Sequence, residues 1–154
     1  MSQREYVVDI DGILHILPCG PFAVLLDSVV EVKPGARILA NKQLSISDPA
    51  FVDHFPRHPV YPPGRMIEVM LQACTVLVYA TEQYDPQQEL VTLVGVNKTK
   101  LRRSVMPGDT LEIEAELVRR KSNVWRFDVS CYVDDYMVAE SGLVLSLHGR
   151  EDAF

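Results

Sequence analysis

The sequence predicts an α+β fold in which antiparallel strands pack on one long, buried helix. Residues 64–82 are apolar on almost every helical face, which is typical of a helix enclosed by other elements. From residue 90 onward, apolar residues recur at about every second position, as in strands that cover a core with one face. Strands and helices that are segregated along the chain in this way form α+β domains.

The first third of the chain predicts two strands that form an antiparallel hairpin. Residues 23–32 are rich in valine and leucine and stop at the turn sequence Lys33-Pro34-Gly35. Residues 37–47 alternate roughly between apolar and polar side chains. Asp48-Pro49 then opens a loop that extends to Pro63.

The central helix is predicted to begin at Gly64 and to end near Glu82. Pro62 and Pro63 suit its entry, because proline fits the first helical turn, where amide donors have no partner. Beyond the helix, strand candidates follow one another, with turn residues between them. These candidates cover residues 90–97, 99–105, 110–120, 124–134 and 137–148.

Composition and charge narrow the possible classes of protein. The chain has 154 residues, of which 47% are hydrophobic, and this predicts one domain over residues 1–154. Its net charge of −6 argues against general nucleic-acid binding. No apolar run has the length of a membrane span, and residues 1–11 lack the apolar centre of a signal peptide. The three cysteines show no metal-ligand or disulfide spacing, so we expect a cytoplasmic protein with free thiols.

One histidine and one acid stand out as candidates for chemistry. His54 lies in a loop stiffened by several prolines, and Glu68 is the one carboxylate in the apolar run 66–80. A charge in apolar surroundings shifts its pKa or finds a partner, which makes its position a candidate site. Taken alone, His54 is also compatible with a polar loop residue, and Glu68 with an acid that complements the helix dipole.

Several motifs resemble one known family. His54-Phe55-Pro56, Pro59 and Pro62 precede Glu68, which stands fourteen positions after the histidine, and Gln72 follows the acid by four positions. Further similar segments are Leu25-Leu26-Asp27, Ala40-Asn41-Lys42, Arg102 to Asp109, Val133-Asp134-Asp135 and Ala139-Glu140. Over residues 17–147 the chain resembles the hot-dog-fold 3-hydroxyacyl-(acyl-carrier-protein) dehydratases of the FabZ and FabA type.

The resemblance implies a hot-dog fold, in which an antiparallel sheet wraps around the long helix. It also implies conversion of a carrier-bound 3-hydroxyacyl thioester to the trans-2-enoyl thioester, in fatty-acid or polyketide-type biosynthesis. The family works as a homodimer, with the histidine of one subunit facing the acid of the other, and its FabZ branch often assembles into hexamers. The acyl chain is carried on the phosphopantetheine of an acyl carrier protein, and no other cofactor or metal is implied.

Dehydration needs a base at C2, an acid at C3 and a donor to the thioester oxygen. His54 suits the base, because histidine titrates near neutral pH. Glu68 suits the acid, because a carboxyl in an apolar setting tends to stay protonated. Substrate contacts are predicted for Phe55, for the Gly64 amide at the helix start, for Arg65 and for Gln72, which orients the acid or satisfies a buried backbone group.

Four basic residues, Lys98, Lys100, Arg102 and Arg103, predict either a docking surface for an acidic carrier protein or a solvated strand face. His58 is interpreted as structural, and Cys74 as a packing residue rather than a nucleophile.

The chain departs from the family pattern inside the central motif. Arg57 and Pro63 each stand where the family has glycine, and Pro63 therefore removes one amide donor. Arg65 stands where an apolar residue is usual; it either pairs with Glu68 and opposes the acid role or holds an anionic group of the substrate or of the pantetheine arm. Residues 19–23, Cys-Gly-Pro-Phe-Ala, replace another family segment.

These departures indicate a specialised pathway and leave two other functions open. One is a non-catalytic or heterodimeric hot-dog partner subunit, which the missing amide and Arg65 favour. The other is an acyl thioesterase, in which Glu68 would activate water.

Overall fold

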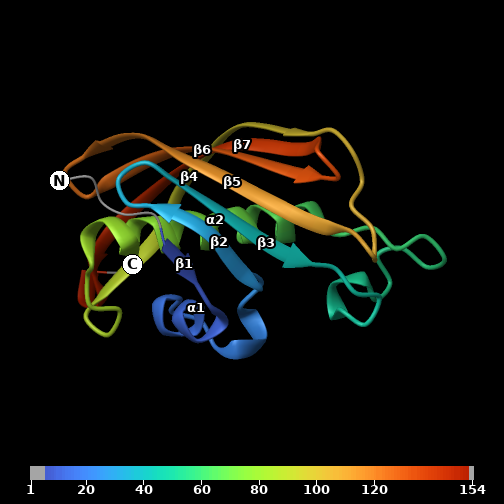
Figure 1. Cartoon of the computed structure of the whole chain (residues 1–154), viewed down its shortest axis with the longest axis horizontal. Coiled ribbons are helices and arrows are strands. Elements are labelled where there is room, and N and C mark those ends of the chain that lie inside the picture. Colours follow the sequence, from blue (N-terminus) through green and yellow to red (C-terminus); the bar gives the residue numbers. More distant parts are fainter. Residues whose placement is uncertain (1–5, 153–154) are drawn as a thin grey trace.

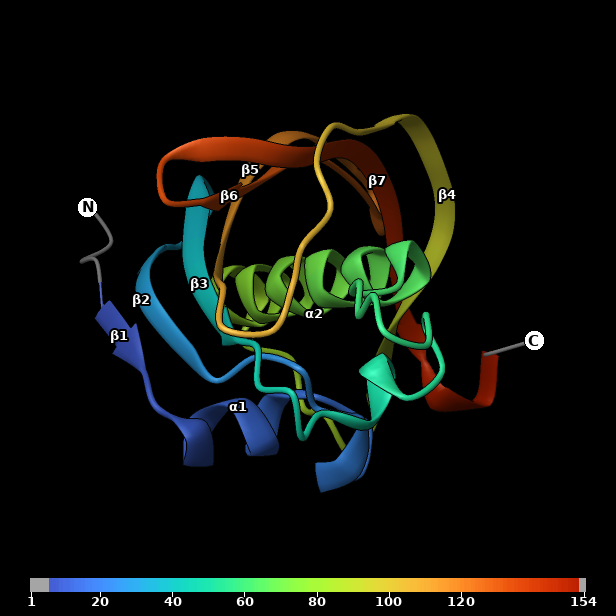
Figure 2. The ribbon, with the colours of Figure 1, turned by 90° about the vertical axis from the view of Figure 1, so that its right-hand side faces the viewer.

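The computed structural model describes residues 6–152. Seven strands form one sheet in the order β1-β2-β3-β5-β6-β7-β4, and every neighbouring pair is antiparallel. The sheet curves around a single long helix, α2 (Pro63–Glu82), so that the helix lies inside its concave face (Figures 1 and 2). This arrangement is the α+β fold that the sequence predicts. The strands are β1 (Tyr6–Val8), β2 (Ser28–Lys33), β3 (Arg37–Gln43), β4 (Glu89–Leu101), β5 (Thr110–Lys121), β6 (Val124–Val133) and β7 (Tyr136–Gly149).

The helix α2 is buried because its apolar side chains lie on several faces at once. Eleven of its residues are buried, including Val69, Met70 and Leu77, which have no exposed surface. The helix begins one residue earlier than predicted, with Pro63 in its first turn and Pro62 as the N-cap. It ends at Glu82, because the C-cap Gln83 has a left-handed backbone (φ 53°), and the Gln83 amide donates to the Tyr79 carbonyl.

Two predicted strands are shorter in the structure. The segment predicted as a strand over 23–32 forms β2 only from Ser28, because residues 21–23 adopt a short 3₁₀ turn, η1 (Pro21–Ala23), and the backbone of Leu25 bonds to a helix side chain. The strand predicted over 37–47 ends at Gln43, because Leu44 bonds to the turn before β5 and Ser45 begins a turn of its own.

Two other expectations differ from the structure. Residues 90–97 and 99–105, predicted as two strands, form the single strand β4 only as far as Leu101, with a register shift between Asn97 and Lys100; residues 102–105 lie outside any strand. The chain before residue 17 carries β1 and a short helix, α1 (Ile10–Ile16), which the sequence interpretation missed. A signal for α1 was present, since the Asp9 side chain caps it by accepting from the Gly12 amide. None of the helices in residues 6–152 combines the length and apolar character needed to cross a membrane.

Candidate active site

His54 is held on a loop between the sheet and α2. The 3₁₀ turn η2 (Pro49–Phe51) precedes it, and the buried ring of Phe51 fastens that turn to the core. The Val60 amide donates to the His54 carbonyl at 2.8 Å, which closes the loop. At the loop tip, Phe55 and His58 exchange two backbone hydrogen bonds of 2.9 Å.

The His54 imidazole has a defined tautomer. Its Nδ1 lies 2.9 Å from the Val60 carbonyl oxygen. A carbonyl can only accept, so Nδ1 carries the proton and the neutral ring keeps its lone pair on Nε2. The ring is half-buried and stacks on Phe55, with the ring centroids 4.3 Å apart. His54 is therefore arranged to take a proton at Nε2.

Arg57 occupies a backbone conformation that favours glycine. Its φ is +64°, in the left-handed region, and its side chain is exposed. Glycine adopts this region at no steric cost, whereas a residue with a Cβ is strained there. The loop therefore keeps the turn that glycine would make, although arginine stands at the position.

The start of α2 presents an open amide. Arg65 and Met66 both donate their amides to the Pro62 carbonyl, at 3.0 and 3.3 Å. Within residues 6–152 no backbone partner is found for the Gly64 amide. Gly64 is exposed, and a Cβ added to it would meet no atom within 4 Å. Gly64 thus offers a free N–H at the positive end of the helix dipole, with room for a ligand atom.

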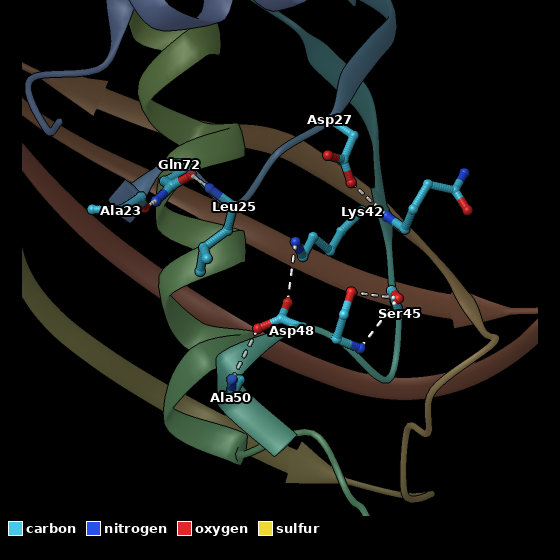
Figure 3. Close-up of polar contacts among 10 residues, drawn as sticks. Ala23, Leu25, Asp27, Lys42, Ser45, Asp48, Ala50 and Gln72 are labelled. Atoms are coloured by element: carbon cyan, nitrogen blue, oxygen red, sulfur yellow. Dashed lines mark hydrogen bonds and ion pairs between the residues drawn. The ribbon is translucent and has the colours of Figure 1, made fainter. Parts of the chain in front are cut away.

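Glu68 is supported by Gln72, one helical turn further on. The Gln72 side-chain nitrogen donates to Glu68 Oε1 at 3.1 Å and to the Ala23 carbonyl at 2.8 Å. Its oxygen accepts the Leu25 amide at 2.8 Å (Figure 3). Gln72 is only 3% exposed, and it contacts both the acid and the backbone of Ala23 and of the buried Leu25.

Arg65 does not pair with Glu68 in the described part of the chain, where none of the ion pairs includes it. It is exposed on the first turn of the helix. Burial and the nearby Asp48 carboxylate raise the pKa of the Tyr61 phenol, and the Arg65 charge opposes that rise in part.

His54 and Glu68 lie on separate elements, and no hydrogen bond or ion pair joins them within residues 6–152. Their pairing, and the substrate contacts of Phe55, Gly64, Arg65 and Gln72, remain predictions. Phe55 is 55% exposed and Gly64 is open, so both are accessible. Cys74, by contrast, has no exposed surface, and burial raises the pKa of its thiol well above 9.0. Both properties fit a packing residue and not a nucleophile.

The four basic residues predicted to dock a carrier protein differ in whether they already have a partner within this chain. Arg102 and Lys100 both approach Glu140 Oε1, at 2.7 and 3.9 Å. The guanidinium of Arg103 lies 4.7 Å from the centre of the Tyr136 ring. Lys98 is exposed and belongs to none of the ion pairs found in residues 6–152.

Sequence reasoning missed a buried polar group beside the His54 loop. Lys42 and Asp48 form an ion pair of 3.5 Å, and their side chains are only 11% and 17% exposed. A signal for Lys42 was present, because it continues the inward-facing positions of Ile38 and Ala40 in β3. The Tyr61 hydroxyl is also buried and lacks a hydrogen-bond partner in the described residues.

Comparison with known proteins places this geometry in context. The model of the FabA-like domain matches residues 17–141. The 3-hydroxyacyl-(acyl-carrier-protein) dehydratase FabZ of Myxococcus xanthus is 41% identical over 144 residues, which cover 94% of each chain. The protein of the same name from Anaeromyxobacter sp. strain Fw109-5 is 38% identical over 147 residues, covering 94% of this chain and 93% of the relative.

Solved structures show the same fold at lower identity. The dehydratase heterocomplex ApeI:P from Xenorhabdus doucetiae superposes with a TM-score of 0.76 and 17% identity, covering 91% of this chain and 93% of that one. A hypothetical thioesterase with coenzyme A from Streptococcus pneumoniae gives a TM-score of 0.63 and 11% identity, covering 79% and 84%. The hot-dog fold predicted from the motifs is thereby confirmed.

Proposed function

Because the chain belongs to the FabA-like family, we propose that it is a 3-hydroxyacyl-(acyl-carrier-protein) dehydratase that forms the trans-2-enoyl thioester and water, in fatty-acid or polyketide-type biosynthesis. The observation that carries the chemical assignment is the His54 tautomer, with Nδ1 bound to the Val60 carbonyl and no partner for Nε2 among residues 6–152. A positioned neutral imidazole can act as the base that removes the C2 proton in an elimination across C2 and C3.

His54 acts as the base in this proposal. Its Nε2 takes the proton from C2 of the substrate, and the ring becomes an imidazolium. The Val60 carbonyl, which already accepts the Nδ1 proton at 2.9 Å, stabilises that cation and keeps the ring in place.

Glu68 acts as the acid. It donates a proton to the C3 hydroxyl as the C3–O bond breaks, and the electron pair of the C2–H bond becomes the new C2–C3 double bond. Water leaves. The hydrogen bond from Gln72 to Glu68 Oε1 holds one oxygen of the carboxyl and so orients the group.

The Gly64 amide stabilises the negative charge that develops on the thioester oxygen. Pro63 has no amide hydrogen, so the donor at the helix start moves to the next residue, where the N–H is open. A backbone donor at a helix amino terminus suits an oxyanion, since the helix dipole adds to the hydrogen bond.

We also propose that two copies assemble into a homodimer and that each site combines His54 of one subunit with Glu68 of the other. The strand β4 supports this, because it is the sheet edge opposite β1 and pairs only with β7 in the described chain. It exposes Val94 (61%), Val96 (43%) and Leu101 (51%), which a second copy would bury. Analytical ultracentrifugation will distinguish a dimer from a hexamer or a monomer.

The substrate arrives on the phosphopantetheine of an acyl carrier protein in this proposal. Lys98 and Arg103 are the basic residues best placed for an acidic carrier, since Lys100 and Arg102 are engaged by Glu140. Arg65 is exposed beside the Gly64 amide and suits the phosphate of the arm or an anionic substrate group. We place the reaction in the cytoplasm, where the three free cysteines stay reduced.

Mass spectrometry of the purified protein with 3-hydroxyacyl carrier protein tests the activity. We expect loss of one water, with His54→Ala and Glu68→Gln each lowering turnover at least about 100-fold. His58→Ala, in the same loop but exposed, and Glu112→Gln, on the outer sheet face, serve as matched controls and should stay close to wild type.

Two outcomes would contradict the dehydratase assignment. Release of free acid in place of enoyl product would identify a thioesterase. A folded dimer that removes no water at any acyl length, and that copurifies with a second hot-dog chain, would identify a non-catalytic partner subunit.

A further inference from the structure

A lysine points into the core from the inner face of β3. The inward positions before it, Ile38 and Ala40, are apolar and at most 1% exposed, whereas Lys42 is 9% exposed. A buried cation is unfavourable unless a counter-charge and hydrogen bonds compensate it. Its counter-charge is Asp48, whose Oδ2 lies 3.5 Å from Lys42 Nζ.

Asp48 connects this lysine to the segment that precedes His54. Its second oxygen, Oδ1, accepts the Ala50 amide at 2.9 Å and so caps the turn η2. Figure 3 shows both contacts of the one carboxylate, toward Lys42 on the strand and toward Ala50 in the turn. The pair therefore fastens η2 to the rigid sheet.

The position of η2 determines that of His54. Phe51, the last residue of η2, is 5% exposed and packs on the Tyr61 ring with 5.7 Å between ring centroids. Its carbonyl accepts the His54 amide at 3.3 Å. On the return side of the loop, the Tyr61 amide donates to the Val105 carbonyl at 2.7 Å. Lys42–Asp48 and Tyr61–Val105 thus hold the two ends of the loop.

We propose that Lys42 and Asp48 are positioning residues for the base His54: their buried ion pair sets the distance between the loop and the substrate without touching the substrate. This role rests on the proposed function. A displacement of about 1 Å in a catalytic group can lower a rate about 100-fold, so loss of the pair should act on kcat.

The test compares Lys42→Met, Asp48→Asn and the double variant in the dehydration assay and in thermal unfolding. Lys42→Met leaves the Asp48 charge buried and unpaired, so it should lower both stability and kcat, the latter about 10- to 100-fold, with KM within about threefold. The Asp48→Asn change keeps a side-chain oxygen that can still accept the Ala50 amide and cap η2. The double variant should therefore regain much of the melting temperature while its kcat stays low.

Two controls separate positioning from general damage. Lys42→Arg keeps the cation and should retain kcat within about fivefold. Lys33→Met removes an exposed lysine from β2 and should change neither kcat nor melting temperature.

The outcomes are distinguishable. If the double variant regains wild-type kcat together with its stability, or if folded Lys42→Met keeps kcat within twofold, the pair is only structural and the positioning role is wrong. If the wild-type protein itself removes no water, the proposed function fails, and the positioning role fails with it.

Discussion

Replacing Gln72 with methionine removes three hydrogen bonds from the interior and keeps an unbranched side chain of similar length. The side-chain oxygen of Gln72 accepts the Leu25 amide at 2.8 Å. Its nitrogen donates to the Ala23 carbonyl at 2.8 Å and to Glu68 Oε1 at 3.1 Å. Methionine can make none of these bonds, so the Leu25 amide and the Ala23 carbonyl lose their side-chain partner. The change therefore tests whether one side chain on α2 holds the segment before β2.

The expected loss in free energy of unfolding depends on how deeply the unsatisfied backbone groups are buried. The Leu25 amide is enclosed, with the residue 7% exposed, and an unsatisfied buried group of this kind costs about 1–3 kcal/mol. The Ala23 carbonyl lies nearer the surface and adds about 1 kcal/mol. We expect the free energy of unfolding to fall by about 2–4 kcal/mol, or roughly 5–15 °C in Tm for a chain of this size.

The same change should slow the reaction, because Glu68 loses the bond that orients its carboxyl. A positioned general acid contributes about 100- to 10,000-fold, and loss of its orientation alone should lower kcat about tenfold. This decrease should appear at temperatures where the variant is fully folded.

Urea unfolding followed by tryptophan fluorescence measures the stability change, because the chain has one tryptophan, Trp125, and it is fully buried. Gln87→Met is the matched control: Gln87 is exposed, and its side chain makes no hydrogen bond within residues 6–152. A Gln72→Met variant within about 1 kcal/mol of this control would refute the role assigned to Gln72.

Three further predictions follow from the strained loop and the buried ionisable groups. Arg57→Gly should leave the free energy of unfolding unchanged or raise it by up to about 1 kcal/mol, whereas Arg57→Val should lower it by about 1–2 kcal/mol, because only glycine tolerates φ +64° freely; urea titration compares the two. Burial raises the pKa of Cys131 from 9.0 to about 12 and that of Tyr61 from 10.0 to about 12, so the folded state holds protons that the unfolded state loses. Stability is then complete below about pH 9 and should fall steadily toward pH 12, by about 4 kcal/mol from Cys131 alone; a flat urea midpoint between pH 9 and 11 would contradict this. Ellman's reagent at pH 8 should modify only the partly exposed Cys19 in the native protein and all three thiols after unfolding, and fast native reaction of the buried Cys74 would show that the core is misassigned.

The periodic segments were predictable because their burial repeats regularly along the chain. The helix was placed within one residue at its start, and the strands β5, β6 and β7 were placed within one residue at each end. In each of these segments, the spacing of apolar residues in the sequence is sufficient to predict which face is buried. The motif around His54 and Glu68 also predicted the fold, since its spacing is characteristic of one family.

The missed features depend on contacts between distant parts of the chain. Residues 24–27 look like a strand by composition, but Gln72, 47 positions after Leu25, supplies the partner that a neighbouring strand would have supplied. The alternation of β3 places Lys42 on the inward face, but it does not show that Asp48 supplies the counter-charge. The pairing of His54 with Glu68 was predicted only through the family resemblance, and it stays a prediction because the proposed site needs two copies.

The two glycine positions that this chain lacks have different physical consequences. At Arg57 the cost is conformational, since the backbone still adopts φ +64° and the loop around His54 keeps its hydrogen bonds. At Pro63 the helix loses nothing, because an amide in the first turn has no internal partner, but the site loses one donor. The next amide along the helix start belongs to Gly64, and a Cβ added there would meet no atom within 4 Å. One donor is therefore lost at Pro63 while the following amide stays open, so the proposed oxyanion contact of Gly64 is compatible with the departure from the family pattern.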